Sequence, residues 1–222
     1  MTEGILLVDK IENKTSFSLV FELRKITGVQ KIGHAGTLDP FATGLMVMLI
    51  GKKYTRMSNS FLNSDKEYIA KICLGKVTDT YDIDGQVLKS CDLMPGLEQI
   101  KEKLALFEGE IKQVPPMFSA KKIGGQKLYH LARKGISIER RPKPVTLSIK
   151  LLEFTPPFLF LDISCSSGTY IRSLAYDLGE ALGCGAYLHS LRRVRAGNFH
   201  IKDAVAQANL FEIDFSNKLI TI

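Results

Sequence analysis

Short runs of apolar residues predict strands, and apolar residues at helical spacing predict helices between them. The strands are expected at 5–8, 45–50, 67–74, 86–89, 144–154, 158–165 and 186–197. The helices are expected from Thr15 to Gly28, with Val20, Phe21, Leu23 and Ile26 on one face, around 53–62, from Pro95 to about Phe107, near 126–134, and from about Thr169 to Leu182. Runs of strands with interspersed helices favour an α+β fold, with a mixed, mostly antiparallel central sheet flanked by helices.

One segment between two predicted strands combines glycines with a single carboxylate. Residues 33–44 read GHAGTLDPFATG and lead directly into the apolar run 45–50. The glycines allow positive φ angles and close approach to a ligand, and Pro40 pushes Asp39 out of helical geometry. The pattern is typical of an active-site loop that holds the Asp39 carboxylate in one pose, although a turn aspartate that caps its own loop would look similar.

The charge of the chain suggests a polyanionic partner. Thirty Lys and Arg residues against 23 Asp and Glu residues give a net charge of +7, which would also suit a basic protein without such a partner. The cationic residues cluster, however, in one stretch at 121–143 and in another at 192–195. The first cluster, with Gly124-Gly125 and Pro115-Pro116 nearby, predicts a mobile, exposed arm at about 115–143 that contacts phosphates.

Other features exclude several classes of protein. The four cysteines are far apart and predict neither a zinc site nor any other metal site. No apolar run is long enough to span a membrane, and the first ten residues do not resemble a signal peptide, so a cytoplasmic protein is expected. The signatures of nucleotide hydrolysis, dinucleotide redox chemistry, zinc proteolysis and α/β-hydrolase chemistry are missing from the sequence.

The glycine-rich segment resembles the catalytic motif of the bacterial tRNA pseudouridine synthase B (TruB) family. Similarity recurs in at least four blocks between about residues 4 and 199, among them 78–85, 115–135 and 168–172. The resemblance implies the pseudouridine synthase fold with an RNA-binding arm. It also implies an enzyme that isomerises the uridine at position 55 of the tRNA T-loop to pseudouridine, by base flipping and without a cofactor.

By this resemblance Asp39 is the essential catalytic residue. The reaction breaks the N1–C1′ glycosidic bond, turns the uracil and rejoins it through C5. An ionised carboxylate could attack C1′, attack C6 or remove the 2′ proton, and the sequence leaves these three options open.

A second block, Gly168-Thr169-Tyr170-Ile171-Arg172, resembles the family motif whose arginine pairs with the catalytic aspartate. A guanidinium can bind a carboxylate bidentately and lower its pKa, which would keep Asp39 ionised in a dry pocket. Arg172 could otherwise be an ordinary surface cation near a helix N-terminus, where it would oppose the helix dipole. Tyr170 matches a family position at the uracil pocket.

Further residues are assigned to the substrate by the same resemblance. Tyr68 would stack on the flipped base, Leu191 would line its pocket, and His34 would help to extrude the nucleotide without transferring a proton. Lys66 would contact a phosphate, or else lie at a solvated strand end. Asp82 would bond an active-site or nucleotide group, since the family has a segment similar to 78–85 near the RNA. The same segment fails the test for a calcium loop.

The RNA backbone is expected to meet cationic side chains on the arm and beside the last strand. The candidates are Lys121, Lys122, Lys127, Arg133 and Arg192, which would position phosphates rather than read bases. For each of them singly, a solvated charged surface is the alternative.

The resemblance and the chain length predict one catalytic domain at 1–200, which includes the arm, followed by a short C-terminal tail at 201–222. Family members commonly carry a second, C-terminal RNA-binding (PUA) domain, and no such domain is expected here. The partner is tRNA, and neither a metal nor a membrane is expected. The chain should act as a monomer. Two alternatives remain open: a non-catalytic RNA-binding module or RNA chaperone, and a synthase that works within a guide-RNA particle.

Overall fold

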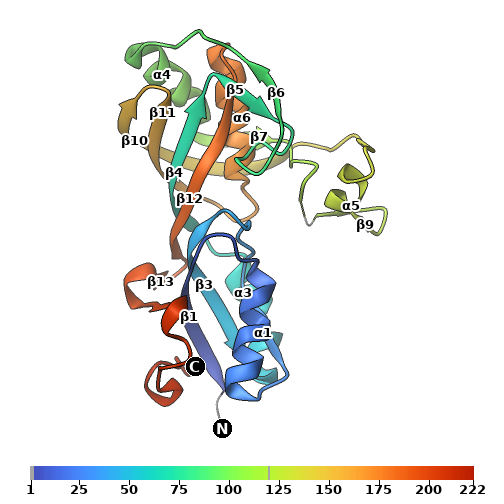
Figure 1. Cartoon of the computed structure of the whole chain (residues 1–222), viewed down its shortest axis with the longest axis vertical. Coiled ribbons are helices and arrows are strands. Elements are labelled where there is room, and N and C mark those ends of the chain that lie inside the picture. The colour runs from blue at the N-terminus through green and yellow to red at the C-terminus, as the bar shows by residue number, and fades with distance from the viewer. Residues whose placement is uncertain (1–2, 120) are drawn as a thin grey trace. The chain divides into compact units, whose positions relative to one another are not determined.

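The fold was analysed in a computed structural model, which describes residues 3–119 and 121–222. The chain divides into two compact units, unit 1 at 1–69 with 191–222 and unit 2 at 70–190. Figure 1 labels the elements of both. Each unit is described here by itself, and the strands β4 (Lys66–Leu74) and β12 (Ala186–Ala196) run from one unit into the other.

Unit 1 is a sheet with one long helix across one of its faces (Figure 1). Its elements are β1 (Gly4–Lys10), α1 (Ser16–Thr27), β2 (Ile32–His34), β3 (Thr43–Ile50), α2 (Lys52–Arg56), α3 (Ser58–Leu62), β13 (Phe199–His200) and β14 (Val205–Ala206). The strand order is β14-β1-β3-β12, with β2 beside β3 and β13 beside β12. The continuous apolar run of β3 is buried throughout its last seven residues, as expected for a central strand.

The predicted position of α1 is confirmed, but two residues of its predicted face are not buried: Phe21 is exposed and Ile26 is half-buried. The Thr15 hydroxyl accepts a hydrogen bond from Ser18 N at 3.0 Å, and Gly28 ends the helix in the left-handed conformation at φ 71°. The buried stripe contains Leu19, Val20 and Leu23. Phe21 is 58% exposed, because it lies two residues, or about 200°, beyond Leu19 around the helix.

Residues 201–222, expected as a tail, pack against unit 1. They form β14 and three 3₁₀ turns at Ile201–Asp203, Gln207–Asn209 and Phe215–Asn217. β14 pairs with β1 in parallel, and Ile5 and Ile220 exchange two backbone hydrogen bonds of 2.9 Å. Beside this pairing, the sheet face of Ile5 and Leu45 packs against the partly buried Ile220 and Phe199.

Unit 2 has strand order β4-β11-β10-β7, and α6 lies along one face of these strands (Figure 1). Its elements are β5 (Lys76–Thr78), β6 (Val87–Ser90), α4 (Leu97–Leu104) with a 3₁₀ turn at Ala105–Phe107, β7 (Gly109–Gln113), β8 (Lys122–Ile123), β9 (Gln126–Lys127), α5 (Leu128–Ala132), β10 (Lys143–Thr155), β11 (Phe158–Cys165) and α6 (Ile171–Leu182). Alternate residues of β11, Leu159, Leu161 and Ile163, are fully buried, which is the pattern of a strand with one covered face.

The predicted fold class is confirmed. The pairs β1–β3, β2–β3, β12–β13, β10–β11 and β7–β10 are antiparallel, whereas β1–β14 and β3–β12 are parallel. The prediction of one helix at 53–62 is wrong, because the chain breaks at Met57 into α2 and α3. In α4, Leu97 is 42% exposed, so the buried face rests on Ile100 and Leu104.

Candidate active site

The Asp39 loop, residues 35–42, connects β2 to β3 in unit 1. Ala35 N donates to Val47 O at 2.9 Å, and Ala42 N donates to Asp39 O at 3.1 Å, which closes a turn around the aspartate. Two glycines flank Asp39, Gly36 within the loop and Gly44 just after it, and both have a φ angle of 102°. Other residues adopt this conformation only at a cost in free energy. Asp39 itself is half-buried.

The segment between β1 and α1 holds this loop from one side. The Ser16 hydroxyl donates to Leu38 O at 2.9 Å and accepts from Leu38 N at 2.8 Å, so both polar groups of that peptide unit are fixed. Asn13 N donates to Pro40 O at 2.9 Å. The residues on both sides of Asp39 are therefore tied to the same neighbouring segment.

Lys10, which the sequence analysis missed, lies buried beside the Asp39 loop. Its ammonium donates to the carbonyls of Ile11 at 2.9 Å, Lys14 at 2.7 Å and Pro40 at 3.2 Å. Burial lowers the pKa of Lys10 to about 8, and the charge of Asp39 acts in the opposite direction. A lysine that ends a strand gives no sequence signal of such a role.

Arg193, on β12, is buried and bonds the Asp39 loop and the strand that follows it. It is 1% exposed, its Nε donates to Leu45 O at 2.7 Å, and one of its terminal nitrogens donates to Gly36 O at 3.2 Å. A Cβ on Gly44 would lie 2.3 Å from Arg193 O, so only glycine allows β3 to approach β12 this closely. The sequence offered a signal for Arg193, because it shares a strand face with the buried Leu191.

His34 ends β2 and lies half-buried near Arg193. Burial lowers the pKa of His34, and the charge of Arg193 lowers it further, whereas a backbone hydrogen bond to Gly36 acts in the opposite direction. His34 is therefore neutral near pH 7, which agrees with a role in contact rather than in proton transfer.

Two cationic candidates of unit 1 bind protein groups. Arg192 makes a bidentate ion pair with Asp9, with distances of 2.6 and 3.1 Å to the two carboxylate oxygens. Lys66 is 7% exposed rather than solvated, and its ammonium donates to the carbonyls of Leu62 and Ser64. Their assignment to phosphates stays a prediction.

The two apolar candidates of unit 1 are both largely buried. Tyr68 on β4 is 9% exposed and Leu191 on β12 is 8% exposed. Their assignment to the flipped base stays a prediction.

In unit 2, Arg172 is the centre of a buried polar cluster. Its side chain lies 3.2 Å from the Asp82 carboxylate, and both side chains are only 6% exposed. The guanidinium also donates to Thr80 O at 3.2 Å and to Phe118 O at 2.8 Å. Arg172 thus joins the start of α6 to the loop after β5 and to the first residues of the arm, and it is not the surface cation that the sequence also allowed.

The loop that carries Asp82 is closed by its own hydrogen bonds. Asp82 Oδ1 accepts from the Thr80 hydroxyl at 2.5 Å and from Asp84 N at 3.1 Å, and Asp79 Oδ1 accepts from Gln86 N at 2.8 Å. These bonds fix Asp82 as a partner of Arg172. Across the described residues, 3–119 and 121–222, no cluster of three His, Cys, Asp or Glu side chains could hold a metal ion.

Tyr170 precedes α6, and its backbone is fixed by a buried amide. Gln113, at the end of β7, donates to Tyr170 O at 3.0 Å and accepts from Tyr170 N at 2.8 Å. The side chain of Tyr170 is half-exposed.

On the arm, β8 and β9 form a short hairpin around Gly124-Gly125, followed by α5. Arg133 is exposed and lies over the Tyr129 ring at 5.5 Å. Burial and the charge of Lys143 lower the pKa of Lys121. The side chains of Lys122 and Lys127 lie outside the described residues, and the mobility of the arm stays a prediction.

The structure thus brings two sets of predicted residues together. Asp39 and His34 share one loop region of unit 1, and Arg172 and Asp82 form one cluster of unit 2. The pairing of Asp39 with Arg172 stays a prediction. Among the residues that the structure describes, no helix is both long and apolar enough to cross a membrane.

Comparison with known proteins assigns most of the chain to two family models. Residues 24–171 match the N-terminal domain of the TruB family pseudouridylate synthases, and residues 172–216 match the tRNA pseudouridylate synthase B C-terminal domain. Proteins named tRNA pseudouridine synthase B are similar over almost the whole chain. The one from Protochlamydia amoebophila is 59% identical over 95% of this chain and 80% of its own length, and the one from Chlamydia felis is 54% identical over 97% and 92%.

Two solved structures share the fold. A chain in the crystal structure of a Cbf5-Nop10-Gar1 complex has a TM-score of 0.74 and 29% identity, over 95% of this chain and 54% of that one. A chain in an H/ACA RNP bound to a substrate RNA containing 2′-deoxyuridine has a TM-score of 0.72 and 27% identity, over 95% and 53%. The chain therefore spans about half the length of these two chains and has the fold of pseudouridine synthases, as expected.

Proposed function

Because the chain belongs to the TruB family of pseudouridylate synthases, we propose that it converts uridine to pseudouridine at position 55 of tRNA. The uridine is flipped out of the T-loop into the site around Asp39. The N1–C1′ bond breaks, the uracil turns, and a C5–C1′ bond forms while C5 loses its proton. The nitrogen N1 gains a proton in exchange for the one that C5 loses, so the product is an isomer of uridine and the reaction needs neither an oxidant nor a cofactor.

The observation that carries the proposal is the fixation of Asp39. Leu38 and Pro40, its two neighbours, are bonded through their backbones to Ser16, Asn13 and Lys10. A carboxylate held in this way keeps one pose without reorganisation during the reaction, which is what a nucleophile or a general base needs. Attack on C1′, attack on C6 and removal of the 2′ proton all remain available to it.

The other residues receive the roles that the family motifs imply. In this proposal Tyr68 stacks on the flipped uracil, Tyr170 and Leu191 line its pocket, and neutral His34 helps to displace it from the RNA. Arg172 keeps Asp39 ionised, and Asp82 holds Arg172 in position.

The RNA backbone is bound by the arm in this proposal. Lys121, Lys122, Lys127 and Arg133 position phosphates of the T stem-loop. Lys66 and Arg192, whose side chains bond carbonyls and Asp9 within unit 1, contact further phosphates in the same proposal. We further propose that the chain works as a monomer in the cytoplasm, where it meets tRNA.

Release of tritium from C5-labelled uridine in a T stem-loop transcript tests the proposal. The wild-type chain alone is expected to release one tritium per target uridine, because C5 loses its proton. Asp39→Asn should release none and still bind the RNA. Asp203→Asn, which removes an exposed carboxylate elsewhere in unit 1, is the matched control and should retain full activity.

Three outcomes would contradict the proposal. Undiminished release by Asp39→Asn would remove the carboxylate from the mechanism. No release by the wild-type chain, with tight binding of the transcript, would favour a non-catalytic RNA-binding module, and release only after a guide RNA is added would favour a guide-dependent synthase.

A further inference from the structure

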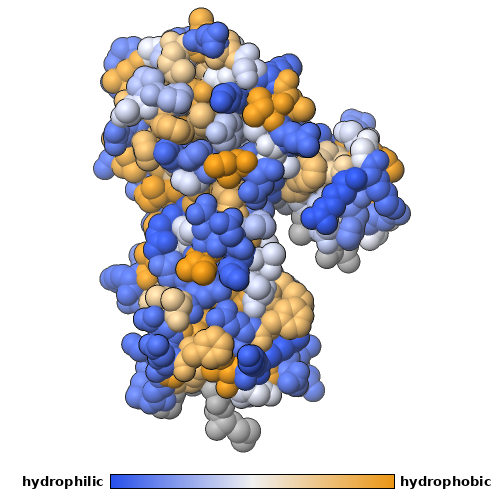
Figure 2. Space-filling model, in the orientation of Figure 1, coloured by the Kyte–Doolittle hydropathy of each residue, from blue (hydrophilic) through white to orange (hydrophobic). Residues whose placement is uncertain are grey.

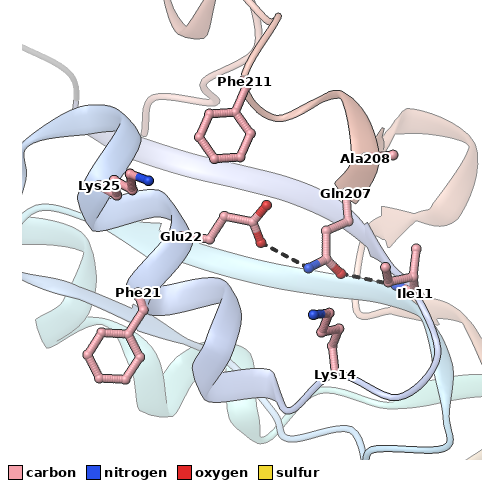
Figure 3. A pocket seen from close by; sticks show the side chains of 8 residues that line it. All are labelled: Ile11, Lys14, Phe21, Glu22, Lys25, Gln207, Ala208 and Phe211. Carbon is pink, nitrogen blue, oxygen red and sulfur yellow. Dashed lines mark hydrogen bonds between the residues drawn. The ribbon is translucent and has the colours of Figure 1, made fainter.

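A pocket of about 410 Å³ opens in unit 1, away from the residues assigned to the reaction (Figure 3). It lies between the segment after β1, the exposed face of α1 and the C-terminal segment around Gln207–Phe211. Its volume is within the range of pockets that bind small ligands. None of the predicted catalytic or substrate residues lines it.

The floor of the pocket is a fixed pair of polar side chains. Gln207 is 4% exposed, its Oε1 accepts from Ile11 N at 3.1 Å, and its Nε2 donates to Glu22 Oε2 at 2.9 Å. The dashed lines in Figure 3 mark these two bonds. An amide retains a second N–H and a second lone pair beyond these bonds, so the floor can still bond the edge of a ligand.

Two exposed phenyl rings stand on opposite sides of this floor in Figure 3. Phe21 is 58% exposed and Phe211 is 62% exposed. Figure 2 shows hydrophobic residues reaching the surface over α1, among hydrophilic ones. One exposed aromatic ring is ordinary on a protein surface, but two rings at one pocket offer a flat ligand a surface on which to stack.

Two lysines supply positive charge at the same pocket. Lys14, just before α1, and Lys25, in its last turn, both line it and are exposed. Within the described part of the chain, neither ammonium group makes an ion pair or a side-chain hydrogen bond. Both are available to an anionic ligand.

We propose that this pocket binds an unpaired nucleotide of the RNA substrate, outside the T stem-loop. The base stacks on Phe21 or Phe211 with its edge toward Gln207, and the flanking phosphates lie at Lys14 and Lys25. A nucleotide uses the rings, the polar floor and the cations together, whereas an acidic peptide would leave the flat rings without a partner. The inference rests on the proposed function, because it takes the substrate to be tRNA.

The pocket is linked to the Asp39 loop within unit 1. The segment that brings Ile11 and Lys14 to the pocket also donates from Asn13 N to Pro40 O. The T-loop nucleotides are needed at the Asp39 loop in the proposed reaction, and the stem is paired. A nucleotide for the pocket must therefore come from elsewhere in the tRNA.

Binding to two RNAs tests the inference: a full-length tRNA transcript and the isolated T stem-loop. The variant Lys14→Ala/Phe211→Ala changes two exposed side chains. Its dissociation constant for full-length tRNA should rise about 10-fold or more, because a stacked base and a phosphate contact are lost. The affinity of the variant should also depend less on salt. The slope of log affinity against log salt concentration should be less steep by about 0.7, the contribution of one single-strand phosphate.

With the isolated T stem-loop, the same variant should match the wild type in both binding and tritium release. A second pair of variants tests whether the position of the charges matters. Lys14→Ala/Lys25→Ala removes the two charges at the pocket, and the control Lys52→Ala/Lys202→Ala removes two exposed charges of unit 1 outside it. The control should lower the affinity for full-length tRNA less than the pocket variant does. Equal losses in these two double variants would overturn the inference, since only general charge would then matter.

Two more results would overturn it: unchanged affinity of Lys14→Ala/Phe211→Ala for full-length tRNA, or an equal loss with both RNAs. The single variant Lys14→Glu, at an exposed position, covers the case in which the double variant fails to fold, and it should also weaken only full-length tRNA. Failure of the proposed function would be visible separately, as a wild-type chain that releases no tritium from either RNA.

Discussion

The two units use buried cations in different ways. In unit 1, Lys10 and Arg193 donate to backbone carbonyls and so fix the path of the Asp39 loop. In unit 2, Arg172 binds two carbonyls and the Asp82 carboxylate, within a pair that is almost fully buried. The Asp39 loop is therefore held by bonds to neutral groups, whereas the Arg172 cluster depends on the balance of two charges.

The largest expected effect comes from breaking that balance in unit 2. Arg172→Met leaves the Asp82 carboxylate buried without its guanidinium, which should lower the free energy of unfolding by about 4 kcal/mol. Urea denaturation measures the change. The double variant Arg172→Met/Asp82→Asn should recover most of the stability but not the tritium release, and a double variant no more stable than the single one would contradict the account.

The corresponding change in unit 1 is steric rather than electrostatic. Gly44→Ala places a Cβ 2.3 Å from Arg193 O at a φ of 102°, and we expect a loss of about 3 kcal/mol in the free energy of unfolding. The control Gly28→Ala also changes a glycine with positive φ, but no atom lies within 4 Å of its Cβ, so it should cost about 1 kcal/mol. Thermal unfolding of both variants should separate the two costs, and equal losses would remove the role of close approach.

A smaller effect is expected when the charge of Lys10 is removed. Lys10→Met deprives three carbonyls of their donor and should lower stability at pH 7 by about 2 kcal/mol. The pKa of Lys10 is about 8, below its ordinary 10.5, so between these values the unfolded chain binds more protons than the folded one. The wild type should therefore gain stability relative to Lys10→Met as the pH rises from about 8 to 10.5.

Two measurements check this prediction. Denaturation of both proteins across that pH interval should show the relative gain, and NMR of the lysine Nζ should show a titration near pH 8. A titration of Lys10 in the wild type near pH 10.5 would contradict the prediction, because burial would then not lower its pKa.

The smallest predicted effect concerns a carboxylate of unit 2. Burial raises the pKa of Asp177 to about 6, with a contribution from Glu180. The folded chain therefore binds more protons than the unfolded one between about pH 4 and 6, so this group lowers stability as the pH rises through that interval. Asp177→Asn removes this charge and should stabilise the chain at pH 7. The gain should be only about 1 kcal/mol, because solvent screens the partly exposed group, and it should vanish near pH 4.

The sequence predicted the local parts of the site well. Glycine and proline act on their own backbone, so the loop around Asp39 and the end of α1 at Gly28 could be read from neighbouring residues. The apolar run of β3 likewise predicted a buried strand without knowledge of its partners.

Contacts between distant residues could not be predicted in this way. The ion pair of Arg192 gave no sequence signal, because its partner Asp9 lies 183 residues away in the sequence. Phe21 was expected in the buried face of α1 but is exposed. The sequence does not show whether an apolar residue at the edge of a helical stripe faces the sheet or the solvent, because that depends on how the helix packs. Lys10 gave no sequence signal, since only the fold brings three carbonyls to its ammonium.

The contact between Gly44 and β12 has a consequence for how this chain can evolve. The atoms that a Cβ would meet belong to the backbone of residue 193, so no side-chain exchange there opens space for it. In a library that randomises both positions, we expect selected clones to keep glycine at 44 whatever accompanies it. Covariation methods, which detect paired changes, would find no signal at this contact.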